Sequence, residues 1–202
     1  MSIWLKVLLT ALAGYLLGAV QWGIIVTRHF GVQDIRKYGS GGTGATNVLR
    51  TIGLRPSLIT FICDLAKGLF AGLIGRWLLG THGACVGGLF AVIGHAWPVF
   101  YQFKGGKGVS TSLGALISVE PILGLATMAI GFTLAFWIRI ISVASLTSTL
   151  FSMAVLMILR CGDWVYVVFA TAICGLIFFL HRDNIKRLLR GEEKKISFSK
   201  RV

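Results

Sequence analysis

Long apolar stretches with very few internal charges divide this chain, and they limit its fold more than any other feature. A transmembrane helix needs roughly 20 predominantly apolar residues. Six stretches are near that length and one is shorter; they cover residues 3–27, 56–79, 83–100, 109–119, 121–138, 141–159 and 164–180. A chain of 202 residues that is 55% hydrophobic and 13% charged cannot bury them all inside a water-soluble globule. We therefore expect an all-α, polytopic membrane protein.

The basic residues predict how these helices cross the membrane. If the chain crosses seven times with its N-terminus outside, 16 of the 20 Lys and Arg residues share the cytoplasmic side, as the positive-inside rule requires. If residues 109–119 failed to cross, Arg139 and the basic tail at about 182–202 would lie outside, so we expect this short segment to cross, either shielded by its neighbours or extended by polar residues that line a cavity. The stretch 3–27 lacks the basic leader of a signal peptide and is too long for one, so we expect a retained helix. The 16 residues are Arg28, Arg36, Lys37, Arg50, Arg55, Lys104, Lys107, Arg139, Arg182, Lys186, Arg187, Arg190, Lys194, Lys195, Lys200 and Arg201.

The net charge of +13 needs no nucleic-acid partner to explain it. Cytoplasmic positive charge suits anionic lipid headgroups and attracts anionic substrates. The tail itself is better explained as a solvated amphipathic segment on the membrane surface than as a specific site. The four cysteines show neither CxxC nor Cys/His metal spacing, so we expect packing residues and no metal or cofactor. No repeat or linker divides the chain, which predicts a single domain over residues 1–202.

The first glycine-rich run, residues 39–47, reads GSGGTGATN. It formally matches the GxGxxG dinucleotide motif, but that motif needs a preceding strand, and this run follows a charged stretch between membrane helices. A loop that feeds a short helix from about Thr46 explains it better, because backbone N–H groups and hydroxyls bind anions at a helix N-terminus. The alternative is a flexible turn with an ordinary cytoplasmic arginine. The residues that we expect to contact phosphate here are Ser40, Gly41, Thr46, Asn47 and Arg50.

The second run, residues 94–111, breaks a helix at Trp97-Pro98 and continues as KGGKG before the short segment begins. A Walker A loop needs Ser or Thr directly after its Lys, whereas Gly108 follows Lys107, so a nucleoside-triphosphatase loop is excluded. Two ammonium groups in an open glycine backbone still suit a phosphate. The residues expected to bind it are Lys104, Gly105, Gly106, Lys107, Ser110 and Thr111.

Three more polar residues fall at the same expected cytoplasmic level. His181 and Asn184 follow the last helix three positions apart and therefore share a face. A histidine at a helix end is often only a partner of the helix dipole, and Ser145 could either bind substrate or bond a helical carbonyl. Within the second helix, Asp64 and Lys67 at i,i+3 are either a functional pair or a mutually neutralising structural one.

These motifs resemble the bacterial acyl-phosphate-dependent glycerol-3-phosphate acyltransferases over nearly the whole chain. In order, the shared elements are the GSGxxGATN-type loop at 39–47 with Arg50, the Asp64/Lys67 helix, the GHxxPVFxxFKGGKGV(S/A)T run at 94–111, the Ser-x-x-Ser element at 142–145 and the HRxNI element at 181–185. One departure is in the first loop, which usually reads GSGN in the family and here has Gly42 in place of the Asn. A side-chain amide therefore has no counterpart at that position, while the backbone cradle is unaffected.

The resemblance implies transfer of a fatty acyl group from acyl phosphate to glycerol 3-phosphate, which gives lysophosphatidate and phosphate in the first step of phospholipid synthesis. It also implies seven helices, an active site at the cytoplasmic face of a bacterial cytoplasmic membrane, no metal, and a soluble partner enzyme that makes acyl phosphate. The catalytic residues expected for this reaction are His181, Lys107, Arg50 and Asn184. We expect the phosphate oxygen of the donor to accept the hydroxyl proton, with His181 as the rival base.

The alternative function is a transporter or binding protein for an organic phosphate anion. Broken helices and an intramembrane ionisable pair suit a transporter. Polar clusters gathered at one face and the absence of an inverted repeat in the sequence argue against it. A purely structural membrane subunit would leave the two phosphate-like loops unexplained.

Overall fold

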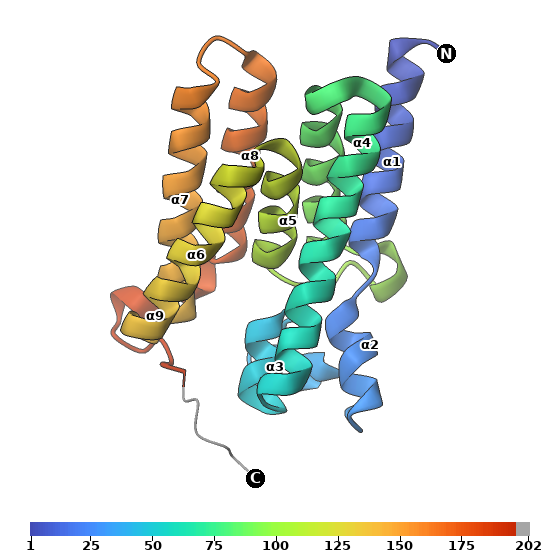
Figure 1. Ribbon diagram of the computed structural model, residues 1–202. Coiled ribbons are helices and arrows are strands. Elements are labelled where there is room, and N and C mark those ends of the chain that lie inside the picture. Colours follow the sequence, from blue (N-terminus) through green and yellow to red (C-terminus); the bar gives the residue numbers. More distant parts are fainter. Residues whose placement is uncertain (197–202) are drawn as a thin grey trace.

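The computed structural model describes residues 1–196, and every regular element within that range is helical (Figure 1). Lys200 and Arg201 of the predicted basic tail lie outside the described residues. The elements are α1 (Ile3–Ala19), α2 (Trp22–His29), η1 (Ile35–Lys37), α3 (Ala45–Thr51), α4 (Leu54–Ala96), η2 (Val99–Tyr101), α5 (Val109–Val119), α6 (Pro121–Ile138), α7 (Ile141–Leu159), α8 (Trp164–Leu180) and α9 (Arg182–Leu189). The expected all-α membrane architecture is confirmed at this level.

Helix α4 is a hairpin, with its reversal at one end of the molecule in Figure 1. Leu79 and Gly80 leave the helical conformation, and Gly80 has a φ of 65°, which glycine adopts without a steric penalty. Glycines keep the two arms close, since a Cβ at Gly75 would collide with the backbone of Gly83. The arms correspond to the predicted stretches 56–79 and 83–100, although the second arm ends at Ala96, where the Trp97-Pro98 pair follows.

Several helices are long and apolar enough to cross a membrane. Within the described residues, four helical stretches meet that standard, and the pair α8 and α9, bent by 59°, would be a fifth. The 48-residue stretch among them contains the α4 hairpin, so it supplies two apolar arms. Large apolar side chains such as Trp4, Ile122 and Trp137 are exposed on the outside of the bundle, which is typical of a surface that faces lipid tails. The four stretches are Ile3–His29, Leu54–Tyr101, Pro121–Ile138 and Ile141–Leu159.

The expected N-terminal helix at 3–27 is interrupted at Val20 and Gln21. The break leaves backbone carbonyls without intrahelical partners, and these must be satisfied elsewhere. The ammonium group of Lys67 bonds the carbonyl oxygens of Gly18 at 2.9 Å and Val20 at 2.6 Å. The side chain of Gln21 also donates to Ala19 O at 3.4 Å. The apolar pattern did not predict this break, because its polar partners come from a distant helix.

Helix α5 has only 11 residues, and it is enclosed by protein. Gly68 and Gly114 allow the first arm of α4 and α5 to touch backbone to backbone. At the far end, Arg76 donates to Ser118 O at 2.8 Å and so caps a terminal carbonyl of α5. A short helix is tolerated at membrane depth when neighbouring protein satisfies its ends. These contacts explain how the short predicted segment 109–119 forms inside the bundle.

The two ends of the bundle differ in charge. At the end that holds the α4 turn, Arg160 pairs with Glu120, and His82 pairs with Asp163 at 2.7 Å. The opposite end gathers α2, α3, α9 and the loop before α5 (Figure 1). Both glycine-rich runs lie at this second end, which we call the loop end.

Candidate active site

The first glycine-rich run is a loop organised by one buried amide, that of Asn47. Its Oδ1 accepts from the backbone N–H of Ser40 at 2.8 Å, and its Nδ2 donates to Gly42 O at 2.8 Å and Tyr38 O at 3.0 Å. Gly39 has a φ of 62°, and a Cβ there would collide with Asn47 Oδ1. Asn47 therefore holds the loop closed around itself, and its side chain is already occupied by the protein backbone.

Helix α3 follows this loop from Ala45, next to the expected start at Thr46. Its one basic residue, Arg50, is half-buried, and the Nη2 group donates to Lys194 O at 3.1 Å. The buried Nε of Arg50 has no hydrogen-bond partner among the described residues. An unpartnered buried guanidinium donor favours an anionic ligand at this place.

The second glycine-rich run is fixed to the end of α4. The N–H groups of Gly105 and Gly106 donate to Ala96 O at 3.2 Å and His95 O at 3.1 Å. A side chain at Gly106 would collide with the His95 ring, so this glycine is required for the close approach. Gly108 has a φ of 78° and precedes α5, whose first N–H groups point back along the loop. Lys107 is thereby held between the end of α4 and the start of α5.

Two side chains connect the first run, and the segment just before it, to the second run. Gln21 accepts from Thr43 Oγ1 at 2.6 Å and donates to His95 O at 3.2 Å, so it bridges the first loop to the second. Arg36 is paired with Asp34 at 2.8 Å and also donates to Tyr101 O at 3.0 Å. These contacts hold the two runs next to each other at the loop end.

Lys107 meets helix α9 at Asn184, which the sequence placed only at the same expected cytoplasmic level. The ammonium group of Lys107 donates to Asn184 Oδ1, and the Nδ2 of Asn184 donates to Glu193 Oε1 at 2.6 Å. The same carboxylate accepts from Ser142 Oγ at 3.0 Å and from Arg187 Nε at 2.6 Å. Sequence reasoning missed Glu193, Arg187 and Ser142 as site residues. Only the Ser-x-x-Ser element gave a signal for Ser142, and nothing in the sequence distinguishes Glu193 from Glu192.

The electrostatic environment of Lys107 favours loss of its proton. The pKa of Lys107 is lowered to about 8, mainly by burial and in smaller part by the positive charges of Arg187 and Arg50, while Glu193 and Asp183 oppose the shift. A carboxylate with three donors is stabilised in its charged form, and the pKa of Glu193 accordingly lies below its usual value despite burial. Within the described residues the ammonium of Lys107 has one protein partner, Asn184, which leaves hydrogen-bond capacity for a ligand.

His181 is buried directly after α8, and its orientation is fixed. Its Nδ1 lies 2.8 Å from Ile177 O. Because a carbonyl only accepts, Nδ1 carries the hydrogen and Nε2 remains as the second functional nitrogen. The charge of Lys107 acts on this imidazole, so the two side chains belong to the same neighbourhood.

Asp64 and Lys67, left open between two roles by the sequence, form a closed internal cluster with His95. Lys67 Nζ lies 2.9 Å from Asp64 Oδ1 and 2.8 Å from His95 Nδ1, in addition to the two carbonyls of the α1 break. Asp64 and His95 are 3.5 Å apart. All donor capacity of the ammonium is used, and His95 in turn supports the glycine loop. These contacts favour the structural one of the two roles.

The other predicted site residues differ in how the structure places them. Ser40 and Gly41 are exposed at the tip of the first loop, and Thr46 and Ser110 are half-buried at helix starts. Thr111 is buried, and its hydroxyl has no partner within the described residues. Ser145 is buried in the first turn of α7, and Lys104 is exposed, with no side-chain hydrogen bond among residues 1–196.

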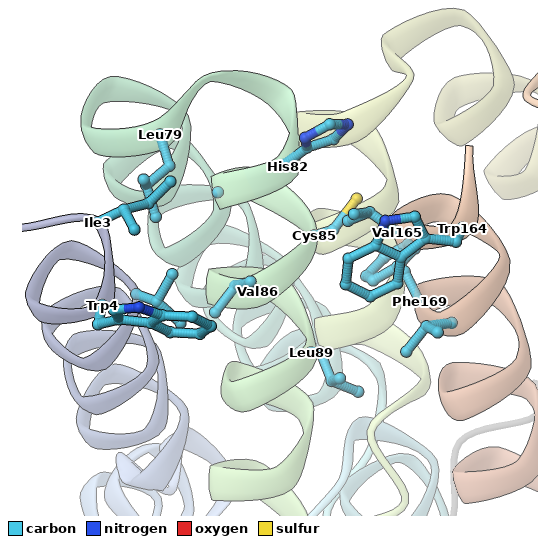
Figure 2. Close-up of a pocket in the computed structure, with 13 residues that line it drawn as sticks. Ile3, Trp4, Leu79, His82, Cys85, Val86, Leu89, Trp164, Val165 and Phe169 are labelled. Atoms are coloured by element: carbon cyan, nitrogen blue, oxygen red, sulfur yellow. The ribbon is translucent and has the colours of Figure 1, made fainter.

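The described residues contain no group of three or more His, Cys, Asp or Glu side chains that could hold a metal ion. An apolar groove of about 430 Å³ exists, but it lies at the α4-turn end between α1, α4 and α8 (Figure 2). Trp4, Val86 and Phe169 are among its lining residues, and it lacks the cations of the loop end. The loop end therefore remains the candidate site, since Lys107 and Arg50 keep donors there without a partner among the described residues.

Comparisons with known proteins place the chain in a family. Residues 8–191 match the family model described as glycerol-3-phosphate acyltransferase. Proteins of that name are 42% identical in Thermoanaerobacter pseudethanolicus (93% of this chain, 94% of the relative) and 45% identical in Jannaschia sp. (93% and 92%). The structure also resembles crystal structures of PlsY, an integral membrane glycerol 3-phosphate acyltransferase. The glycerol 3-phosphate form aligns with a TM-score of 0.88 at 35% identity (95% and 96% covered), and the lysophosphatidic acid form with 0.86 at 34% (95% and 96%).

Proposed function

The chain belongs to the glycerol-3-phosphate acyltransferase family, and on this premise we propose that it transfers a fatty acyl group from acyl phosphate to glycerol 3-phosphate. The observation that carries the proposal is the pair of cations at the loop end, Lys107 and Arg50. Each keeps hydrogen-bond donors without a partner among the described residues. Both substrates bring phosphate to such a cluster. The products are lysophosphatidate and inorganic phosphate.

In the proposed reaction a hydroxyl oxygen of glycerol 3-phosphate attacks the acyl carbonyl carbon. The bond from that carbon to the phosphate oxygen then breaks, and phosphate leaves with its electron pair. Because the donor is a mixed anhydride with a good leaving group, no covalent enzyme intermediate is required. Catalysis then comes from positioning the hydroxyl against the carbonyl and from fixed positive charge near the developing negative charge.

We assign Lys107 and Arg50 to the phosphate groups and Asn184 to the orientation of Lys107. Asn47 is assigned to holding the first loop, because its amide is occupied by backbone groups. The hydroxyl proton goes to a phosphate oxygen of the donor, with Nε2 of His181 as the rival acceptor. The remaining phosphate contacts of the proposal are Ser40, Gly41, Thr46, Lys104, Gly105, Gly106, Ser110, Thr111 and Ser145.

The proposal includes a membrane arrangement: a single domain that crosses seven times, with the N-terminus outside and the loop end at the cytoplasmic face of a bacterial cytoplasmic membrane. Three observations support it. The α4 hairpin supplies two apolar arms, α1 begins at the end opposite the loop end, and the loop end carries the excess of cations. A cytoplasmic site could receive acyl phosphate from the soluble enzyme that makes it.

Purified protein in detergent tests the function. With acyl phosphate and glycerol 3-phosphate present, phosphate release that depends on glycerol 3-phosphate and is matched by lysophosphatidate is the expected result. Folded protein without this release would contradict the proposal. The alternative, a phosphate-anion transporter, has no chemistry to perform in detergent and predicts no release.

A further inference from the structure

After α9 the chain turns back over the site, and a glycine at the end of the helix sets this reversal. Glu192 N–H donates to Arg187 O at 2.8 Å and Gly191 N–H donates to Leu188 O at 3.1 Å, while Gly191 has a φ of 71°. These are the paired bonds of a Schellman motif, in which glycine ends a helix and reverses the chain. Residues 191–196, which we call the C-terminal strap, therefore leave α9 in a fixed direction.

Two hydrogen bonds attach the strap to other elements of the loop end. Ile196 is buried, and its N–H donates to Arg139 O at 2.7 Å in the turn between α6 and α7. Arg50 of α3 donates to Lys194 O at 3.1 Å. Just before these attachments, the strap places the side chain of Glu193 against the site. This side chain is only 2% exposed.

Glu193 decides which way the Asn184 amide faces. A carboxylate only accepts hydrogen bonds and an ammonium only donates them, whereas an amide has one end of each kind. With Nδ2 of Asn184 bonded to Glu193 Oε1 at 2.6 Å, the amide oxygen is left for Lys107. The carboxylate is itself held by Ser142 at 3.0 Å and Arg187 at 2.6 Å. If the carboxylate were lost, the amide could turn over and present its NH2 group to the ammonium.

We propose that Glu193 is a positioning residue for the acyl transfer: it fixes the Asn184 amide so that Lys107 is held, charged, toward the phosphate groups. This inference rests on the proposed function. Three cations, Lys107, Arg50 and Arg187, share the neighbourhood of this one buried carboxylate. Glu193 thus also offsets their mutual repulsion, which would otherwise disfavour a charged Lys107.

The test uses the full-length protein with Glu193→Gln, Glu193→Asp and the matched control Glu192→Gln. Glu192 is exposed on the same strap, so its variant removes the same charge without touching Asn184. For Glu193→Gln we expect kcat to fall about 10- to 100-fold, the size known for hydrogen-bond partners that orient metal ligands, with a smaller change in KM. Glu193→Asp recovers part of the rate, and Glu192→Gln matches the wild type.

A second readout separates positioning from mere folding and does not need turnover. Acetylation of Lys107 at a series of pH values, followed by mass spectrometry, measures its titration. The charged groups that face Lys107 are Arg50 of α3, Asp183 and Arg187 of α9, and Glu193 of the strap, with His181 nearby. In Glu193→Gln the titration of Lys107 moves to lower pH, and in Glu192→Gln it does not.

The outcomes are distinct. A wild-type protein without acyl transfer contradicts the proposed function. In that case the titration of Lys107 still tests whether Glu193 keeps this lysine charged. If the wild type is active, and Glu193→Gln has the same rate and the same Lys107 titration as the wild type, the inference is overturned. A Glu193→Gln variant with a lower KM for glycerol 3-phosphate and an undiminished kcat also overturns it, because the carboxylate would then be a competitor of phosphate.

Discussion

Two buried lysines show how the same side chain can serve opposite purposes in this protein. Lys67 lies inside the bundle with its three N–H groups used by His95 and two carbonyls of the broken helix, and its charge is paired with Asp64. Lys107 lies at the loop end with one protein partner, Asn184, among the described residues. A closed lysine stabilises the fold, whereas a half-open lysine retains capacity for a ligand. Whether the N–H groups of a lysine have protein partners, more than how deeply the lysine is buried, distinguishes the two roles.

Removing the closed lysine should have the largest effect. Lys67→Met leaves Asp64 buried without its counter-charge and leaves two helix-end carbonyls unpartnered. Breaking a buried pair in this way costs about 3–5 kcal/mol. We expect a marked loss of thermal stability and of folded yield in detergent. The Asp64→Asn/Lys67→Met double variant should recover part of that stability; equal stability of Lys67→Met and wild type would contradict the closed assignment.

Removing the half-open lysine should spare the fold and disable the reaction. For Lys107→Met we expect kcat/KM to fall about 10²- to 10³-fold, the scale for loss of one preorganised electrostatic donor. Its melting temperature should be equal to or above that of the wild type, because a partly desolvated charge is gone. The control is Lys37→Met, at an exposed position of η1. Normal turnover by Lys107→Met would remove this residue from the mechanism.

The pH profile sharpens the same contrast. Since burial lowers the pKa of Lys107 to about 8, the charged form that holds phosphate is lost as the pH rises through that value. We expect the rate to decline above about pH 8 and to fall roughly tenfold for each further unit, which is simple titration behaviour. Initial rates corrected for uncatalysed hydrolysis measure it. A rate that stays constant to about pH 10 would mean that Lys107 keeps its ordinary pKa.

The smallest effect is expected at His181. If a phosphate oxygen of the donor accepts the hydroxyl proton, His181→Gln keeps most of kcat at saturating substrates. A general base is worth about 10²- to 10⁴-fold, so a loss beyond 10²-fold would instead assign the proton to Nε2 of His181. The measurement is kcat at saturating substrate concentrations, with thermal stability as the control for the buried bond to Ile177.

Much of this architecture follows from local sequence patterns. Apolar stretches predicted the helices, Trp97-Pro98 predicted the end of the second α4 arm, and the position of His181 and Asn184 after the last apolar stretch predicted that they lie at the same end as the two loops. These features depend on periodicity and turn chemistry, which operate over a few residues.

What the sequence did not predict depends on contacts between distant segments. The break at Val20–Gln21 becomes stable only when Lys67 and Gln21 satisfy its carbonyls and join it to α4. Glu193 stands beside Glu192 in a mixed-charge stretch, and only the reversal at Gly191 turns one of them inward. A single sequence carries no local signal that separates two such neighbours.

The most direct test of the contrast labels both lysines in one experiment. Folded wild-type protein is treated with an acetylating reagent with and without glycerol 3-phosphate, and the modification of Lys67 and Lys107 is measured by mass spectrometry. We predict that Lys107 reacts and is protected by glycerol 3-phosphate, while Lys67 does not react in either sample. Labelling of Lys107 that is unaffected by glycerol 3-phosphate, or a Lys67 that reacts readily in folded protein, would contradict the assignment of one open and one closed lysine.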